Sequence, residues 1–518
     1  MSASTAILFA IFAPLVAIPG IALCNTRPNL REAIILLTAS LVFISVSSLF
    51  IDVADGGRPS LQLGEILPGL SLMLALEPLG MLFAGIASFL WIVTTIYSIG
   101  YMRGHQERNQ TRFYIYFAIA ISSALGIAFA GNMFTLFIFY EVLTISTFPL
   151  VTHSGSDEAK RAGRIYLGIL IGTSIFLQLT AIIWTWNIAG TLDFTVGGIL
   201  HDRASAGLTG LLIAMYVFGI GKAAVMPFHR WLPAAMVAPT PVSALLHAVA
   251  VVKAGVFTVL KVTIYIFGID NLASLGSSTW LQYIAAATIL IASLIAMSKD
   301  NLKARLAYST VSQLSYIVLG AMMASAAGVL GGAMHIATHA FGKITLFFCA
   351  GAIMVASHKS EISQMRGLGH KMPITFICFL IASLSIIGLP PFGGMWSKWY
   401  LALGAAKTDQ QIFIAVLMIS SLLNVAYLLP IVARGFFSKS KGTKHDDVCN
   451  EIHGIEPQAN NPNDDAVSSN QWKFGGMEEA PVSSVIAIIL TTVGCGMLFF
   501  YADAIYHFLL PLIHGEVG

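Results

Sequence analysis

Two histidines and a lysine recur at four-residue steps in the apolar stretch MHIATHAFGKITLF: His335, His339 and Lys343. Because an α-helix turns by about 100° per residue, a step of four drifts by only about 40°, so these side chains share one helix face over about 12 Å. Histidine titrates near neutral pH, and burial favours the uncharged form of lysine. Such a stripe can pass protons, whereas a single histidine in this helix would be interpreted as a packing residue.

Two more lysines stand beside helix breakers. Lys222 lies in MYVFGIGKAAVMPFHRWLP, just ahead of Pro227, and Lys398 follows LPPFGG in SIIGLPPFGGMWSKWYLALG. Proline removes a backbone donor and clashes with the carbonyl four residues earlier, so both segments are predicted to be interrupted helices. In membranes, interrupted helices are tolerated where they are buried in protein or line a water-filled cavity, and transporters bind ions there.

Glu141, in NMFTLFIFYEVLTISTFPL, is the one carboxylate near the centre of a predicted span, whereas Glu77 lies closer to a span end. We expect Glu141 to pair with Lys222. A structural salt bridge is the alternative, but a buried pair is weak evidence for stability because both partners lose their hydration. The hypothesis is a switch in which the lysine holds its proton while the carboxylate is near and releases it when the pair opens.

A third segment opens with Pro239 and Pro241 and contains both His247 and Lys253. A spacing of six places these two side chains about 120° apart around an ideal helix, so one pathway would need a local distortion to use both. Which of the two is the relay stays open. Lys261, near the end of the same segment, is expected to snorkel to the membrane interface and to have no transport role.

These residues need a scaffold of membrane-spanning helices. The chain has 518 residues, of which 57% are hydrophobic and 10% charged, as is typical of a polytopic membrane protein. Because bare backbone is not tolerated in lipid, apolar runs long enough to cross about 30 Å are predicted to be helical. The predicted spans number fourteen: 5–24, 32–51, 71–100, 113–130, 132–152, 163–188, 207–228, 240–264, 279–297, 304–324, 326–357, 374–402, 410–433 and 482–512.

The positive charges alternate between connections, as the positive-inside rule requires of a correct span assignment. Arg164 and Arg305, each the second residue of a span, are counted with the connections that precede them. Connections after odd-numbered spans then carry 20 Lys and Arg, and those after even-numbered spans carry 3. Both termini are therefore predicted to lie outside the cytoplasm, with the chain crossing a bacterial inner membrane many times. The remaining cations fall within the spans: Lys222, Lys253, Lys261, Lys343 and Lys398.

The spacing also predicts an internal repeat. Spans four to eight (113–264) and nine to thirteen (279–433) form two blocks of five in which the fourth helix is the interrupted one, and an odd block length gives the two blocks inverted topology. The first three helices occupy 1–112, a polar cytoplasmic loop occupies 434–481, and 482–518 holds the last helix.

Other chemistry has little support in the sequence. The five cysteines form no CxxC or CxxCH motif, and no nucleotide-binding or nucleophile-elbow motif is present, so no cofactor and no metal is expected. A metal site at His445, Cys449 and His453, or a haem between His247 and His339, is a minor alternative. The polar loop is expected to be disordered, and no nucleic-acid partner is expected.

Three segments carry a family resemblance: GKAAVMPFHRWLPAAMVAPTPVSALLHAVAVVKAG, HIATHAFGKITLFFCAG and GLPPFGGMWSKWYLALG. They resemble the antiporter-type subunits shared by respiratory complex I, membrane-bound hydrogenases and Mrp-type cation/proton antiporters, and the wording KMP…GLPPF…SKWYLALGA is most similar to the D-type subunits of Mrp antiporters. The resemblance implies an all-α membrane fold of about fourteen helices, with two inverted five-helix repeats and broken helices 7 and 12. It also implies an ion path, which maps here to Glu141, Lys222, Lys253 with His247, His335, His339, Lys343 and Lys398.

Two functions are compatible with such a path. The favoured one is a subunit of a multisubunit antiporter that exchanges Na⁺ or another monovalent cation for protons, with other membrane subunits and the lipid bilayer as partners. The alternative is the proton-pumping membrane subunit of a complex I-like or hydrogenase-type redox complex. Because this chain carries no redox-centre motif, it would not itself transfer electrons. A subunit coupled to inorganic-carbon uptake is a further alternative.

Overall fold

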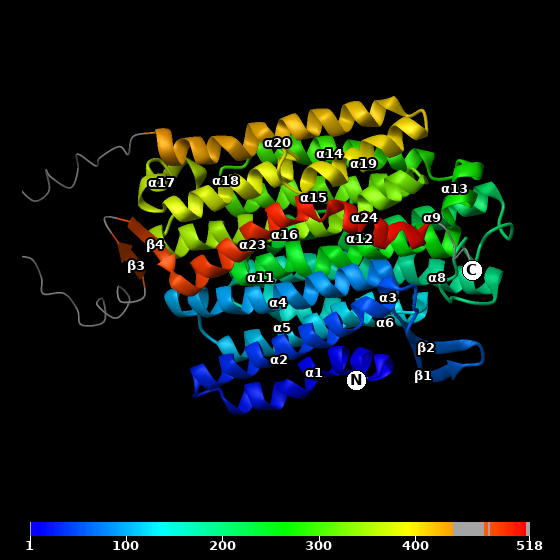
Figure 1. The fold of residues 1–518 in the computed structure, drawn as a ribbon, viewed down its shortest axis with the longest axis horizontal. Helices are drawn as coiled ribbons and strands as arrows, with labels where there is room; N and C mark the ends of the chain where they lie inside the picture. The colour runs from blue at the N-terminus through cyan, green and yellow to red at the C-terminus, as the bar shows by residue number, and fades with distance from the viewer. Residues whose placement is uncertain (1, 439–470, 475–476, 514–518) are drawn as a thin grey trace, which may run out of the picture.

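Long helices run side by side in this computed structural model, which describes residues 2–438, 471–474 and 477–513 (Figure 1). The first half contains α1 (Ala3–Leu23), α2 (Pro28–Ser48), α3 (Phe50–Ala54), α4 (Pro78–Gly104), α5 (Gln110–Ala128), α6 (Met133–Val151), α7 (Asp157–Thr173), α8 (Thr180–Ala189), α9 (Ala206–Gly219), α10 (Trp231–Ala234), α11 (Thr240–Ala244), α12 (Val251–Lys261) and α13 (Ile269–Leu275). The second half contains α14 (Thr279–Ser298), α15 (Leu302–Met322), α16 (Ala326–Ser357), α17 (Leu368–Lys371), α18 (Pro373–Ile387), α19 (Gly394–Lys407), α20 (Gln411–Phe437), α23 (Val482–Phe500) and α24 (Ala502–Leu509).

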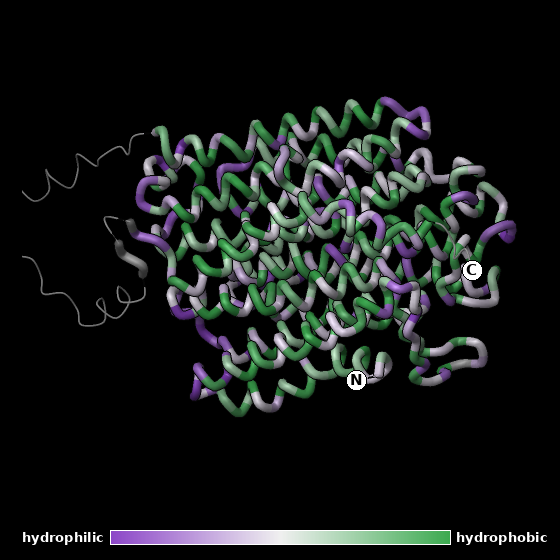
Figure 2. Tube along the Cα trace, viewed as in Figure 1, coloured by the Kyte–Doolittle hydropathy of each residue, from purple (hydrophilic) through white to green (hydrophobic). Residues whose placement is uncertain are grey.

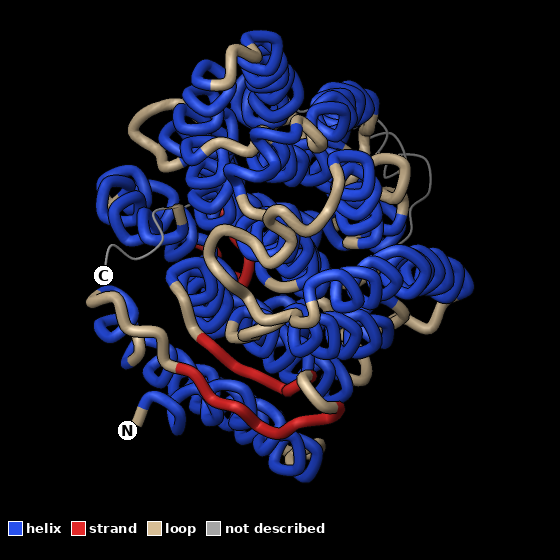
Figure 3. The backbone as a smooth tube through the Cα atoms, turned by 90° about the vertical axis from the view of Figure 1, so that its right-hand side faces the viewer, coloured by secondary structure: helices blue, strands red, loops and turns tan. Residues whose placement is uncertain are grey.

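Shorter elements join or cap these helices. Wide π-helical turns occupy Ser174–Leu179, Leu245–Val249 and Val262–Phe267, and turns of 3-10 helix occupy Gly221–Ala223, Ala235–Val237, Ile362–Gln364 and Leu510–Leu512. Strands β1 (Ser60–Leu67) and β2 (Leu70–Ala75) form one antiparallel hairpin, and β3 (Gln471–Phe474) pairs antiparallel with β4 (Met477–Pro481). Most helices are seen nearly end-on in Figure 3, where one strand pair crosses the end of the bundle that faces the viewer.

The two ends of the bundle differ from its middle. We call the end that carries β1 and β2 the hairpin end, and the end that carries β3 and β4 the opposite end (Figure 1). Hydrophilic residues gather toward both ends, and hydrophobic residues dominate the length between them (Figure 2). This distribution is the one that a bilayer around the middle of the bundle requires.

Ten helical segments of the described chain are long and apolar enough to cross a membrane, or eleven if the bent segment from Val251 to Leu275 is one span. The predicted count of fourteen is therefore not confirmed, although every predicted span range contains helix. The difference arises because α9 and α18 stop early, at 14 and 15 residues, and because α15 is rich in polar residues. The third predicted span also began too early, since β2 precedes the helix there.

Both predicted interruptions are present. After α9 ends, one 3-10 turn (Gly221–Ala223) follows and α-helix resumes only at Trp231. After α18 ends, the chain turns at Gly388, whose φ of 91° is in the left-handed region that favours glycine, and α19 begins at Gly394. A Cβ atom on Gly394 would lie 1.8 Å from the carbonyl oxygen of Ser385, so a side chain at this position does not fit.

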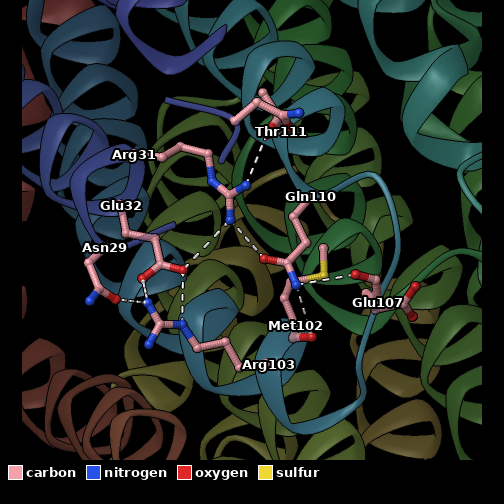
Figure 4. A network of polar contacts seen from close by, with 9 residues as sticks. Asn29, Arg31, Glu32, Met102, Arg103, Glu107, Gln110 and Thr111 are labelled. Carbon is pink, nitrogen blue, oxygen red and sulfur yellow. Dashed lines mark hydrogen bonds and ion pairs between the residues drawn. The ribbon is translucent and has the colours of Figure 1, made fainter. Parts of the chain in front are cut away.

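A polar network fastens three helices at the opposite end (Figure 4). Arg103, in the last turn of α4, forms an ion pair with Glu32 of α2. Arg31, also on α2, donates to Gln110 Oε1 at 2.8 Å and to Thr111 Oγ1 at 2.9 Å at the start of α5. These contacts hold the ends of α2, α4 and α5 together, away from the interrupted helices.

Candidate functional site

Lys222 is fully buried in the 3-10 turn that follows α9. Its Nζ donates to the carbonyl oxygen of Tyr140 at 2.9 Å and to Thr144 Oγ1 at 2.5 Å, and it lies 3.1 Å from the centre of the Tyr140 ring. The backbone here packs tightly against α12, because a Cβ atom on Gly255 would lie 2.4 Å from the carbonyl carbon of Lys222. Oxygen atoms and an aromatic face therefore hold this amine at the break.

Glu141 follows Tyr140 on α6 and is the expected partner of Lys222. Both of its carboxylate oxygens are buried, and neither makes a standard hydrogen bond with a described residue. The carboxylate interacts electrostatically with Lys222 and with the Ser174 hydroxyl. The structure therefore shows the two charged groups near each other but not in direct contact.

Lys253, on α12, meets His339, on α16. The lysine Nζ and the histidine Nδ1 lie 2.5 Å apart, and both side chains are fully buried. A local distortion, which one pathway would need in order to use both His247 and Lys253, is present just before Lys253 as the π-helical turn Leu245–Val249. His247 belongs to this turn, but its side chain lies outside the described part of the structure, so the contact with α16 is established for Lys253 alone.

His335 lies one helical turn before His339, and the two ring centres are 5.9 Å apart. Its Nδ1 is 2.9 Å from Ser397 Oγ of α19, and its Nε2 is 3.1 Å from Gln313 Oε1 of α15. The imidazole is thus fixed between two helices, with each ring nitrogen in contact with a polar atom.

Lys398, in the first turns of α19, donates from Nζ to the carbonyl oxygen of Ile387 and to Ser421 Oγ, both at 2.9 Å. Its Nζ also lies 5.0 Å from the centre of the Tyr316 ring, which stacks on His335 at 5.7 Å. The lysine lines a cavity of about 620 Å³ between α19 and α20. We call the set formed by Lys253, His339, His335 and Lys398 the central row.

Lys343 continues the predicted stripe along α16, but its hydrogen bond is made with a residue outside the central row. Its Nζ donates to Ser309 Oγ of α15 at 2.5 Å, and that hydroxyl lies 2.7 Å from the Tyr427 hydroxyl of α20. The three residues of the stripe together contact α12, α15 and α19, and Lys343 forms a side branch of the central row.

Sequence reasoning missed the uncharged groups that hold these side chains. They are buried or half-buried hydroxyls, a backbone carbonyl, aromatic rings and an amide, contributed by these residues: Tyr140, Thr144, Ser309, Gln313, Tyr316, Ser397, Ser421 and Tyr427. Only position along the chain gave a signal, since Tyr140 adjoins Glu141 and Ser397 adjoins Lys398.

The expectation that Lys261 snorkels to the membrane interface is wrong. Lys261 is 1% exposed, and its Nζ lies 2.8 Å from Glu77 Oε1. The physical reason is that the helix continues beyond Lys261 as the buried turn Val262–Phe267, which leaves the side chain inside the protein beneath the start of α4. Glu77 does lie at a helix end, as expected, where it caps α4.

These contacts bring amines, imidazoles and hydroxyls into one buried array, and each of these groups can donate or accept a proton. Within the ranges that the structure describes, no cluster of three or more His, Cys, Asp or Glu side chains could hold a metal ion. His445, Cys449 and His453 lie outside those ranges, as does most of the polar loop.

The fold and the buried cations define a class: a polytopic membrane protein with two interrupted helices and a row of ionisable groups between them. Residues 130–424 match the family model described as NADH:quinone oxidoreductase/Mrp antiporter, TM. The chain belongs to this family, and the resemblance inferred from the sequence is confirmed.

Similar proteins include components of different membrane complexes. NADH-quinone oxidoreductase subunit N of Desulforudis audaxviator (strain MP104C) is 31% identical over 375 residues, which cover 71% of this chain and 74% of that relative. The probable A/B subunit of a K(+)/H(+) antiporter of Rhizobium meliloti (strain 1021) is 28% identical over 77% of this chain, which spans only 40% of that relative. A chain in the solved structure of the Mrp complex from Dietzia sp. DQ12-45-1b has a TM-score of 0.81 and 20% identity, with coverage of 100% of this chain and 98% of that one.

Proposed function

We propose that this chain is the D-type subunit of a multisubunit monovalent cation/proton antiporter of the Mrp kind, with Na⁺ as the exchanged cation. The central row carries the proposal, because it connects α12 to α19 through groups that exchange protons. Buried ionisable residues in membrane helices are costly and are typical of ion and proton pathways. The similarity to a chain of an Mrp complex and to part of a K(+)/H(+) antiporter supports this assignment.

In the proposed mechanism, Lys222 loads a proton when Glu141 moves into contact with it. The approach of the carboxylate stabilises the ammonium form, and its departure favours release. In this mechanism, the arrangement in which Tyr140 and Thr144 hold the amine is taken as the opened pair. A released proton then passes along the central row, where short side-chain movements hand it on, to Lys398 and its cavity.

The proposal includes an orientation and a division of the chain. The opposite end faces the cytoplasm of a bacterial cell, and both termini lie on the other side of the inner membrane. Residues 113–264 and 279–433 form two inverted repeats, which places the breaks after α9 and α18 at equivalent positions. Other membrane subunits complete the complex.

The proton-pumping subunit of a redox complex is the second candidate, favoured by the similarity to a quinone oxidoreductase subunit. The same residues would move protons, but electron transfer in a partner subunit would supply the energy. Mass spectrometry of the complex, purified from native membranes in mild detergent, distinguishes the two. Small hydrophobic partners alone would support the antiporter, and partners with iron–sulfur or nickel sites would overturn it in favour of the redox pump.

The direct test is proton transport in everted vesicles that contain the intact complex, with a pH-sensitive dye and added Na⁺ or K⁺ salt. Glu141→Gln and Lys222→Ala should each reduce cation-driven proton movement by about 100-fold, the scale of losing a positioned proton-transfer group. Lys160→Ala, at a side chain that is 62% exposed, is the matched control. Wild-type rates in both site variants would refute the proposed path.

A further inference from the structure

A second buried ion pair lies at the hairpin end, outside the central row. Lys261 Nζ is 2.8 Å from Glu77 Oε1, and the Tyr265 hydroxyl donates to the other carboxylate oxygen. Glu77 Oε1 also accepts a hydrogen bond from the Gly80 backbone N–H at 3.2 Å, which fixes the carboxylate at the start of α4. The lysine and the glutamate are 1% and 7% exposed, so both charges have lost nearly all contact with bulk water.

A cavity of about 490 Å³ reaches this pair. Glu77, Lys261 and Tyr265 line it, together with Arg58 before β1 and Asp193 in the connection from α8 to α9. Asp193 is exposed, so the cavity extends to the protein surface. Its volume has room for on the order of ten water molecules, since each occupies about 30 Å³ in the liquid.

One member of the pair lies on the same helix as one end of the central row. Lys261 and Lys253 lie on the same helix, two turns apart, which corresponds to about 12 Å along the axis. Water and movement of the two long lysine side chains can bridge a gap of that length. The rings of Phe194 and Tyr265 lie 4.4 and 4.8 Å from the Lys261 ammonium, and both rings line the cavity.

We propose that Glu77 and Lys261 form a proton-exchange site that opens the first five-helix block to the hairpin side of the membrane. The Lys261 ammonium gives one proton to cavity water, which leaves a neutral amine and a hydronium ion, and the amine is reprotonated from the direction of Lys253. Glu77 holds the charged form of the lysine between transfers. The charged or titratable groups that face the pair across the cavity are Tyr265, Arg58 and Asp193.

This inference rests on the proposed proton path and extends it with a second opening. A purely structural ion pair is the competing explanation, and removing both partners separates the two. Replacing both members of a buried pair leaves no unpaired charge, so the fold is expected to tolerate the double variant Glu77→Gln/Lys261→Met. The control is Lys371→Gln/Glu478→Gln, which removes an exposed ion pair at the opposite end.

In everted vesicles with Na⁺ or K⁺ salt, the cation-driven proton flux of Glu77→Gln/Lys261→Met should be at least about tenfold lower than that of the wild type. The variant should still assemble with its partner subunits. The control at the opposite end should retain the wild-type flux. Wild-type flux in Glu77→Gln/Lys261→Met would overturn the inference, and the proposed function would stand if Lys222→Ala is inactive in the same vesicles. Absence of cation-driven flux in wild-type vesicles would instead overturn the proposed function.

A second measurement decides the matter if the double variant fails to assemble. Thr195 lies on the exposed rim of the cavity, and Ser274 is exposed on α13 at the same end. Thr195→Cys and Ser274→Cys, each made without the native cysteines, are treated with a membrane-impermeant thiosulfonate from the hairpin side. Modification at Thr195→Cys should reduce proton flux severalfold and modification at Ser274→Cys should not. Equal flux before and after modification at Thr195→Cys would overturn the inference.

Discussion

Lys253 Nζ lies 2.5 Å from His339 Nδ1, and this contact joins α12 to α16. Both residues are fully buried, and the next ionisable group on α16, His335, is one turn away. In the proposed path, a proton that crosses between the two proposed repeats, 113–264 and 279–433, passes through this pair of side chains. The two residues should therefore act as one unit.

Lys253→Met and His339→Phe test this coupling. Each single variant should reduce proton flux by about 100-fold. The double variant should reduce it no further, because either substitution alone already removes the proton transfer between the two side chains. Flux is measured in vesicles, with copurification of partner subunits as the control for assembly. Losses that multiply in the double variant would show that the two residues act independently.

Gly255 positions α12 against the interrupted segment. A Cβ atom there would lie 2.4 Å from both the carbonyl carbon of Lys222 and the backbone nitrogen of Ala223, and backbone atoms cannot move aside as a flexible side chain can. Gly255→Ala should separate α12 from the break and reduce both flux and yield severalfold. Gly168→Ala is the control, since a Cβ atom at that exposed position meets no other atom within 4 Å. Equal behaviour of the two variants would contradict this account.

The positions of the buried cations could be predicted from the sequence because membrane helices make ionisable residues conspicuous. Lys222, Lys253 and Lys398 were identified from charge in apolar segments and from nearby prolines, and the breaks appear where those prolines and glycines stand. The stripe on α16 was predicted from a four-residue period alone, and it lies on the buried part of that helix.

The contacts of these cations could not be predicted, because partners come from other helices. No local pattern indicates that His335 would meet Ser397 or that Lys343 would meet Ser309, since those pairings depend on helix packing. Lys261 was misjudged for the same reason: snorkelling assumes a free helix end, and the structure places α4 over it. The predicted number of fourteen spans is not confirmed, because the interrupted helices α9 and α18 are too short to cross a membrane by themselves.

Glu479, on β4, caps the start of α18. Its carboxylate accepts hydrogen bonds from the backbone N–H groups of Ile374 and Thr375 at 2.8 and 3.2 Å, and from Thr375 Oγ1 at 2.6 Å. Burial raises the pKa of Glu479, and these hydrogen bonds oppose the rise. Glu479→Ala should lower the free energy of unfolding by about 1–2 kcal/mol, the usual cost of a lost helix cap, seen as a lower melting temperature in detergent.

The neighbouring residue Glu478 provides the control for that measurement. It is exposed and pairs with Lys371 at 3.1 Å, and exposed ion pairs contribute about 0–1 kcal/mol. Glu478→Ala should therefore leave the melting temperature almost unchanged. If both variants melted alike, the capping role of Glu479 would be refuted.

Glu107, in the connection between α4 and α5, should make stability depend on pH. Burial raises the pKa of its carboxyl group, while His105 and Lys303 oppose the rise, and His105 and His153 lie 3.9 and 4.0 Å from its oxygens. A raised pKa means that the folded chain keeps this proton to a higher pH than the unfolded chain, whose pKa is about 4.3. Between the two pKa values the folded state binds more protons, so this group's contribution to stability falls as pH rises and levels off above the folded pKa.

The glutamine in Glu107→Gln cannot ionise, so this variant does not lose stability through ionisation at position 107 as the pH rises. The melting temperature of the variant minus that of the wild type should therefore increase as the pH rises from about 4.3, and then become constant. The pKa of His153 is lowered, chiefly by burial, so this histidine is uncharged near neutral pH and gives the carboxylate no compensating positive charge there. The measurement is thermal unfolding of the two purified proteins in the same detergent over a series of pH values. If the difference in melting temperature stayed constant or decreased with pH, ionisation of Glu107 would not destabilise the folded chain, and the prediction would be wrong.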